Sequence, residues 1–201
     1  MGQSLMFVGN TLSTTDIKAP LVGARALPIS GMVDYEDGGI GISDPSEGLL
    51  YQIWKATIVD AGGSNKEVYF EAPNTTPYLV YSGGNITEIS FTFDQNMRPA
   101  LAFVENDLPY LRWYDSSAGA QVVTALGSGV TNPRVFLDDK RVLESSNSDI
   151  ILGYIRADNL YFRMQRDRFG VEYLLKEGVL SLSKIGMNRQ LRLQFMVMYN
   201  G

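Results

Sequence analysis

The chain has 201 residues, of which 45% are hydrophobic and 19% are charged, a composition typical of a globular protein with a buried core. Its formal net charge of −5 disfavours binding to nucleic acid, because an acidic surface repels phosphate groups. The absence of histidine and cysteine excludes Ser-His-Asp and Cys-His catalysis, zinc sites built on these residues, and disulfides.

Residues 1–48 are rich in Gly, Pro, Ser and Asp, and they predict an extended N-terminal arm with one or two short strands. The acidic run from Asp34 to Asp37 precedes two glycines and suggests a calcium loop, but its spacing does not match an EF-hand. A polar turn is favoured, so we expect no metal site. The N-terminal residues lack a basic leader and no long apolar run follows, so we expect neither a signal peptide nor membrane insertion.

Residues 49–94 change to an alternating pattern that predicts an antiparallel β segment. Strands are expected over 51–59, 67–72, 78–82 and 86–94, with turns at Gly62-Gly63 and Gly83-Gly84. We find no amphipathic helical pattern in the chain. The sequence therefore predicts an all-β protein built of antiparallel meander sheets.

An internal repeat lies between residues 89 and 176. When the chain is shifted by 51 residues, Leu101–Arg112 lies over Leu152–Arg163, and four of the twelve aligned residues are identical. At a shift of 44, residues 91–94 resemble 135–138. These matches predict two four-stranded repeats, over about 89–126 and 133–176, each the size of a propeller blade. The alternative is that any two hairpins resemble each other.

Two such repeats cannot bury their own faces, because each sheet needs a neighbour on both sides. Either residues 49–94 supply a further sheet, or other chains complete the arrangement. Three chains with two repeats each would close a ring of six sheets, so we expect association as a trimer or higher. Residues 177–201 alternate again and predict C-terminal strands.

No catalytic constellation is visible, so we expect a protein that is not an enzyme and uses no cofactor. Adjacent acids such as Asp138 and Asp139 would point to opposite faces of a strand, which is wrong for a cooperating pair. They follow an apolar run and favour a turn. A glycan hydrolase that uses two carboxylates is a remaining, weaker alternative.

The repeated strands carry aromatic and arginine side chains that are the better candidates for binding. Aromatic rings beside arginines can stack on sugars or form a subunit interface, although the same rings also fill the space between sheets. Trp113 and Arg112 alternate, so one face of their strand at most would serve a ligand. The candidate ligand-binding residues are Tyr110, Arg112, Trp113, Tyr161 and Arg163.

Two segments, Asp158–Leu175 and Ile185–Val197, resemble parts of structural proteins from tailed-phage virions, of the tail-fibre, tail-tip and baseplate kind. The likeness covers about the last hundred residues, and its motifs are not diagnostic of one role. The resemblance implies a symmetric particle protein that needs no active site. Residues 1–48 would then be an arm that reaches onto a neighbouring subunit.

Together these observations predict a structural component of a phage tail, baseplate or fibre, assembled in the host cytoplasm and located in the virion. Its expected partners are copies of itself and other virion proteins, with attachment to a host-surface glycan as a further role. The alternative is a lectin-like carbohydrate-binding module with aromatic pockets.

Overall fold

The computed structural model describes residues 3–8, 11–12, 39–41, 53–71, 76–94, 96, 98–138, 149–187 and 193–199. This part of the chain forms sixteen β-strands and the 3-10 helix Gln165–Asp167, with no α-helix. The all-β prediction is confirmed. Asp34 to Asp37 and Asp139 lie outside the described residues. No helix in the described ranges is long and apolar enough to cross a membrane.

The strands make four antiparallel sheets of four strands each, and three of the sheets are meanders in chain order. The first sheet contains β3 (Gly39–Gly41), β4 (Ile53–Gly62), β5 (Asn65–Glu71) and β6 (Tyr78–Gly83). The second contains β7 (Ile86–Phe93), β8 (Pro99–Glu105), β9 (Leu108–Asp115) and β10 (Ala120–Ala125). The third contains β11 (Val130–Asp138), β12 (Asp149–Arg156), β13 (Asn159–Met164) and β14 (Tyr173–Glu177).

The fourth sheet joins the two ends of the chain. It contains β15 (Val179–Met187), β16 (Leu193–Tyr199), β1 (Gln3–Val8) and β2 (Thr11–Leu12), in that order. β1 pairs antiparallel with β16, and β3 pairs with β4. The described strands of the predicted N-terminal arm therefore complete sheets of their own chain, because backbone groups at a strand edge are satisfied by the nearest available partner.

The second and third sheets are the predicted repeats, and their hydrogen-bond registers agree residue by residue. Leu101 pairs with Arg112 and Phe103 with Tyr110, while Leu152 pairs with Arg163 and Tyr154 with Tyr161, each 51 residues later. The shift of 44 also holds, because Phe91 pairs with Leu101 and Val135 with Leu152. The agreement ends at the fourth strand, where Trp113 pairs with Val122 but Phe162 pairs with Tyr173.

Both repeats turn from their second to their third strand through two residues with positive φ. These are Asn106 (49°) and Asp107 (64°) in the second sheet, and Ala157 (49°) and Asp158 (57°) in the third. A two-residue hairpin loop needs this left-handed geometry at both positions, and Asn and Asp accept it more readily than residues such as alanine. The loop of the third sheet is therefore the more strained of the two.

Replacing Ala157 with asparagine, the residue at the equivalent position of the other repeat, is expected to raise the free energy of unfolding by about 0.5–1 kcal/mol. The gain arises because asparagine tolerates the left-handed conformation at lower cost. Urea denaturation followed by circular dichroism would measure it. The reverse change, Asn106→Ala, should destabilise the protein, and it also removes the acceptor of the Asn85 backbone N–H. Equal stability of wild type and Ala157→Asn would contradict the strain argument.

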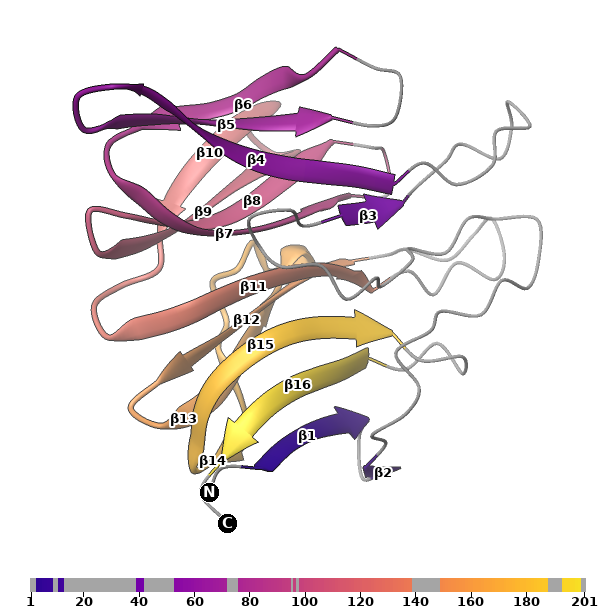
Figure 1. The fold of residues 1–201 in the computed structure, drawn as a ribbon. Coiled ribbons are helices and arrows are strands. Elements are labelled where there is room, and N and C mark those ends of the chain that lie inside the picture. Colours follow the sequence, from indigo (N-terminus) through magenta and orange to yellow (C-terminus); the bar gives the residue numbers. More distant parts are fainter. Residues whose placement is uncertain are drawn as a thin grey trace.

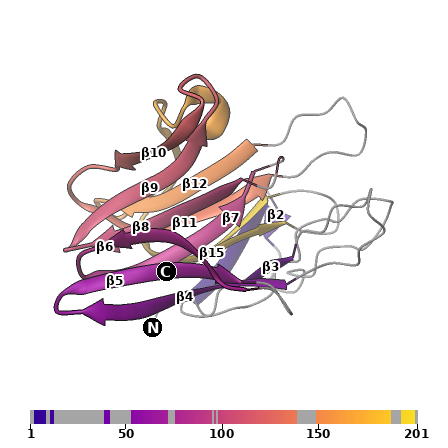
Figure 2. The same cartoon turned by 90° about the horizontal axis from the view of Figure 1, so that it is seen from above.

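The sheets pack in chain order, mainly through their first strands. β7 packs against β3 and β4, β11 packs against β7, and β15 packs against β11. Figure 1 shows the four sheets stacked in a row, with the first and the fourth at opposite ends. The view from above in Figure 2 looks along this row, with the first sheet nearest the viewer and the strands of the fourth sheet fainter behind it. Each repeat is therefore covered on both faces within one chain.

This arrangement decides between the two explanations for the buried faces. The first sheet, β3 to β6, packs against the second sheet. The fourth sheet, which contains β15, β16, β1 and β2, packs against the third. The structure contains the two predicted four-stranded repeats and, beside them, two further four-stranded sheets. A ring of six sheets from three chains therefore does not follow from this structure, because its arithmetic assumed two sheets per chain.

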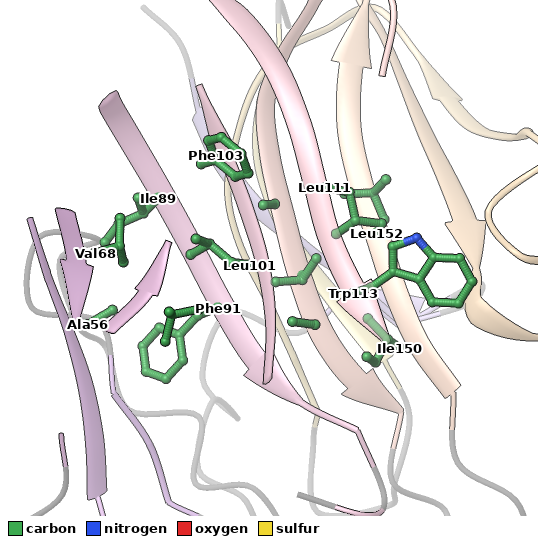
Figure 3. Close-up of a cluster of buried hydrophobic side chains, with 14 of the residues drawn as sticks. Ala56, Val68, Ile89, Phe91, Leu101, Phe103, Leu111, Trp113, Ile150 and Leu152 are labelled. Carbon is green, nitrogen blue, oxygen red and sulfur yellow. The ribbon is translucent and has the colours of Figure 1, made fainter. Parts of the chain in front are cut away.

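The core fills the spaces between neighbouring sheets. Figure 3 shows Ala56, Val68 and Leu101 between the first two sheets, and Leu111, Trp113 and Leu152 between the second and third. A second cluster, which includes Phe136, Ile151, Leu182, Phe195 and Val197, lies between the third and fourth sheets. A methyl group on Gly153 would lie 2.7 Å from Ile185 Cδ1, so a larger residue there would have to displace side chains of the fourth sheet.

One buried ion pair links three sheets. Arg134 on β11 is 3% exposed, and its Nη1 lies 2.5 Å from Glu88 Oε1 on β7. Its Nε donates a hydrogen bond of 2.8 Å to the carbonyl oxygen of Ser183 on β15. A guanidinium group is suited to this position, because it donates in several directions from one rigid plane.

Candidate functional site

The five candidate residues lie on equivalent strands of the two repeats. Tyr110, Arg112 and Trp113 are on β9, and Tyr161 and Arg163 are on β13. Residues two apart on a strand share a face, so Tyr110 and Arg112 lie together, as do Tyr161 and Arg163. The structure therefore makes two equivalent tyrosine–arginine pairs rather than one site of five residues.

Trp113 belongs to the core. It is 4% exposed, and its ring packs edge-on against Phe169 with 5.0 Å between ring centroids. Its indole N–H donates to Thr124 Oγ1 on the neighbouring strand at 3.4 Å. Trp113 therefore faces the third sheet, on the opposite side of β9 from Arg112, as the strand alternation predicts.

In the pair on the third sheet, Tyr161 and Arg163, the arginine is neutralised by a carboxylate. Arg163 Nη2 lies 3.2 Å from Glu172 Oε2, and Arg163 Nε donates to the hydroxyl oxygen of Tyr154 at 2.8 Å. The Tyr154 hydroxyl and Arg156 Nη2 also donate to Glu172. The Arg156 guanidinium lies over the ring of Tyr161, 5.0 Å from its centroid. Every charge in this cluster has a partner of opposite sign.

These contacts change the pKa values of Glu172 and Tyr154. Desolvation acts to raise the pKa of Glu172, but hydrogen bonds from Tyr154 and Arg163 and the charges of Arg156 and Arg163 outweigh it, so the pKa is lowered. The pKa of Tyr154 is raised, chiefly by desolvation and by its hydrogen bond to Glu172. The ionised carboxylate and the neutral phenol are therefore the forms that the fold stabilises.

The lowered pKa of Glu172 predicts acid sensitivity. As pH falls below about 4.3, the unfolded chain binds a proton at this carboxyl before the folded protein does, so the unfolded state gains stability. The contribution of Glu172 is complete above that pH and is lost as pH falls through the lowered pKa. Glu172→Gln should therefore make the free energy of unfolding less dependent on pH between about 5 and 3.

Urea denaturation of both proteins at several pH values would measure this difference. Glu177→Gln, a change at an exposed position of β14, is the control for the loss of one negative charge. The same loss of stability between pH 5 and 3 in wild type and Glu172→Gln would argue against the cluster.

The pair on the second sheet has a different environment. Arg112 Nη1 donates to Gln121 Oε1 on β10 at 3.1 Å. The ring of Phe103 stacks on Tyr110 at 5.5 Å and 23°, and it also contacts the ring of Tyr81 on β6 at 4.4 Å. The equivalent rings of Tyr154 and Tyr161 also stack at 23°, with 6.1 Å between centroids. The aromatic framework is thus repeated, whereas the partners of the arginine are not.

Desolvation is the main cause of the pKa shifts of Arg112 and the tyrosines near it. The pKa of Arg112 is lowered, because the effect of burial exceeds the opposing influence of Tyr78 and Tyr81. Burial raises the pKa of Tyr78 to about 12, and the charge of Arg112 acts against this rise. The pKa of Tyr81 is also raised to about 12, by desolvation first and then by its hydrogen bond to Glu105. The charge of Arg112 therefore interacts with both tyrosines of β6.

A difference in loop length explains why the two pairs differ. β9 and β10 are joined by the short turn 116–119, whereas β13 and β14 are joined by residues 165–172. The longer loop supplies Glu172 to Arg163, and it places Phe169 against Trp113 and Arg168 against Asp115. The turn 116–119 of the second sheet is too short to supply such a residue, and no carboxylate of the described strands and turns pairs with Arg112.

Sequence reasoning missed Glu172, Tyr78, Tyr81 and Gln121, which complete these two clusters. Glu172 lies in the part of the repeat that fails to align, and this irregularity was the available signal. The basic stretch from Arg163 to Arg168 is largely neutralised, because Arg163, Arg166 and Arg168 pair with Glu172, Asp149 and Asp115. Among the described residues, no group of three or more metal-ligating side chains occurs.

The two clusters are therefore cationic and phenolic side chains set between neighbouring sheets of an all-β chain. No known protein family, curated protein or solved structure matches this chain.

Proposed function

We propose that this chain is a structural component of a tailed-phage virion, in the tail, baseplate or fibre, that works through contacts with copies of itself and with other virion proteins. The sequence resemblance of residues 158–175 and 185–197 is one support for the proposal. In the structure these segments fall in the third and fourth sheets, over β13 to β16.

The observation that carries the proposal is the chemistry of the sheet edges. β6, β10 and β14 are each the last strand of a sheet, and none of them pairs with a further strand among the described residues. Each bears at least one exposed large apolar side chain: Leu79 on β6, Val123 on β10, and Leu174 and Leu175 on β14. Unpaired edges with exposed apolar side chains favour association with another chain.

β14 is the most exposed of these edges. Leu174 is 51% and Leu175 is 40% exposed, and neighbouring Val171 is also exposed. A monomeric protein usually protects such an edge with charge, proline or a covering segment. Subunit contacts would remove these side chains from water, at about 25 cal/mol for each Å² of apolar surface that becomes buried.

Sedimentation velocity tests the assembly role. Wild type is expected to sediment as an oligomer at micromolar concentration, and the double variant Val123→Lys, Leu174→Lys as a smaller species. Val59→Lys is the matched control, because Val59 is 44% exposed, similar to Val123 at 49%, but lies on β4 inside its sheet. The control should associate like wild type.

The virion location is tested on particles. Mass spectrometry of purified virions of the encoding phage should detect the chain at a fixed ratio to the other tail proteins. A monomeric wild-type protein that is also missing from purified virions would overturn the proposal. Equal loss of association in the edge variant and in Val59→Lys would overturn the assignment of the contacts to the edges.

A further inference from the structure

Arg112 is a half-buried cation that forms no ion pair with a carboxylate of the described residues. Within the part of the chain that the structure describes, its one hydrogen-bonding contact is with the neutral amide of Gln121. Its equivalent in the other repeat, Arg163, binds both Glu172 and the Tyr154 hydroxyl. The internal repeat thus gives two copies of one arginine position, one with its anion and one without.

A guanidinium group that is partly removed from water is stabilised by an anion that accepts two of its hydrogen bonds. Gln121 occupies one side of Arg112, and the Gln121 amide nitrogen is itself held by the carbonyl oxygen of Pro99 at 3.3 Å. The side chain of Arg112 is therefore oriented while most of its donors remain unused. Such an arrangement is suited to a ligand carboxylate.

Two phenol groups belong to the surroundings of Arg112: Tyr78 of β6 is near enough to influence the pKa of Arg112, and Tyr110 is two residues away on the same face of β9. Neither the Tyr78 nor the Tyr110 hydroxyl is hydrogen-bonded to another group among the described residues, whereas the Tyr81 hydroxyl donates to Glu105. Tyr78 is held by its ring, which packs edge-on against Phe70 with 5.9 Å between centroids. Tyr110 is held by stacking on Phe103. Both hydroxyls are thus carried on fixed rings.

We propose that Arg112, with the hydroxyls of Tyr78 and Tyr110, binds the carboxylate-bearing ring of an acidic sugar, and that this carboxylate occupies the position that Glu172 has beside Arg163. An aspartate or glutamate from another protein would satisfy the guanidinium but would leave the phenols without partners. A uronic acid offers a carboxylate together with ring hydroxyls, so it matches all three groups. Arg112 pairs across the strands with Val123 of β10, so this site adjoins one of the edges proposed above for subunit contacts. The two proposals are tested separately, because sugar affinity reports on the site and sedimentation reports on assembly.

Binding is tested with two sugars that differ at one group. Methyl β-glucuronide carries a carboxylate where methyl β-glucoside carries a neutral hydroxymethyl group. Saturation-transfer NMR and a titration of arginine side-chain N–H signals should show the glucuronide binding with a Kd on the order of 1 mM, typical of a ligand of this size. The glucoside should bind at least tenfold more weakly.

Variants locate the site. Arg112→Gln should weaken glucuronide binding at least tenfold, and Tyr78→Phe, which keeps the ring, should weaken it about three- to tenfold. Arg163→Gln is the matched control from the other repeat and should leave the affinity unchanged. Circular dichroism checks the fold of each variant. Tyr78→Phe keeps the test decisive even where Arg112→Gln fails to fold, because a loss of affinity supports the site and an unchanged affinity overturns it.

Two other results would overturn the proposal. Equal binding of glucuronide and glucoside would show that the carboxylate is not recognised. Equal affinity for the glucuronide and for a glutamate-containing peptide, unaffected by Tyr78→Phe, would assign Arg112 to a protein carboxylate instead of a sugar.

Discussion

Replacing Arg134 with methionine is expected to lower the free energy of unfolding by about 3–5 kcal/mol, the cost of breaking a buried ion pair. Arg134 is nearly inaccessible to water, and it connects Glu88 of the second sheet with the Ser183 carbonyl of the fourth. Methionine fills part of the volume but leaves both acceptors without their donor. In a chain of this size the midpoint of thermal unfolding should fall by about 10 °C.

A surface ion pair provides the control for Arg134. Lys55 and Glu71 form a cross-strand pair on the first sheet, with Lys55 about half exposed. Lys55→Met should cost less than about 1 kcal/mol, because exposed pairs are screened by water. The double variant Arg134→Met, Glu88→Leu should recover at least about 1 kcal/mol of the loss, because it removes the unpaired carboxylate. Similar costs for Arg134→Met and Lys55→Met would contradict the role of Arg134 as the link between sheets.

The second large effect is expected for Phe169→Ala, with a loss of about 3–5 kcal/mol of stability. Phe169 is 2% exposed and belongs to the loop between β13 and β14, yet its ring packs against Trp113 of the second sheet. Its removal creates a cavity between two sheets and admits water to the indole ring. The fluorescence maximum of the protein should therefore shift to longer wavelength.

Urea denaturation and fluorescence spectroscopy would measure both effects in one experiment. Val59→Ala is the control, because Val59 is 44% exposed and lies outside the proposed subunit contacts, so its truncation should change stability by no more than about 0.5 kcal/mol. A Phe169→Ala variant with wild-type stability and an unshifted emission maximum would show that the loop does not anchor the two sheets to each other.

Local patterns in the sequence were sufficient for most individual strands. The expected strand over 86–94 is observed as Ile86–Phe93, and the one over 78–82 as Tyr78–Gly83. Period-two alternation and glycine turns report on a strand and its immediate neighbour, which are close in the chain. The 51-residue shift predicted the strand register correctly for the same reason, because the register that the two repeats share lies within a single hairpin.

The site was only partly predictable. Alternation placed Arg112 and Tyr110 on one face and Trp113 on the other, and the structure agrees. The same alternation could not predict that Arg112 and Arg163 have different partners, because the sequences around the two arginines are alike. Their difference comes from Glu172, which lies in a loop that is longer in the third sheet, and from Tyr78 and Tyr81, which belong to another sheet.

The sequence by itself determined the β-strands, their turns, the register within each repeat hairpin, and the lack of histidine and cysteine chemistry. The tertiary structure alone decided that four sheets cover one another within one chain, that β1 pairs with β16, and that Arg134 links three sheets. The physical reason is distance along the chain. Strands that pair with a neighbour in the chain show a period-two pattern of apolar residues, which a short stretch of sequence reveals. Packing between sheets brings together residues that are far apart in the chain, and it depends on their shape and charge, which a short stretch of sequence does not reveal.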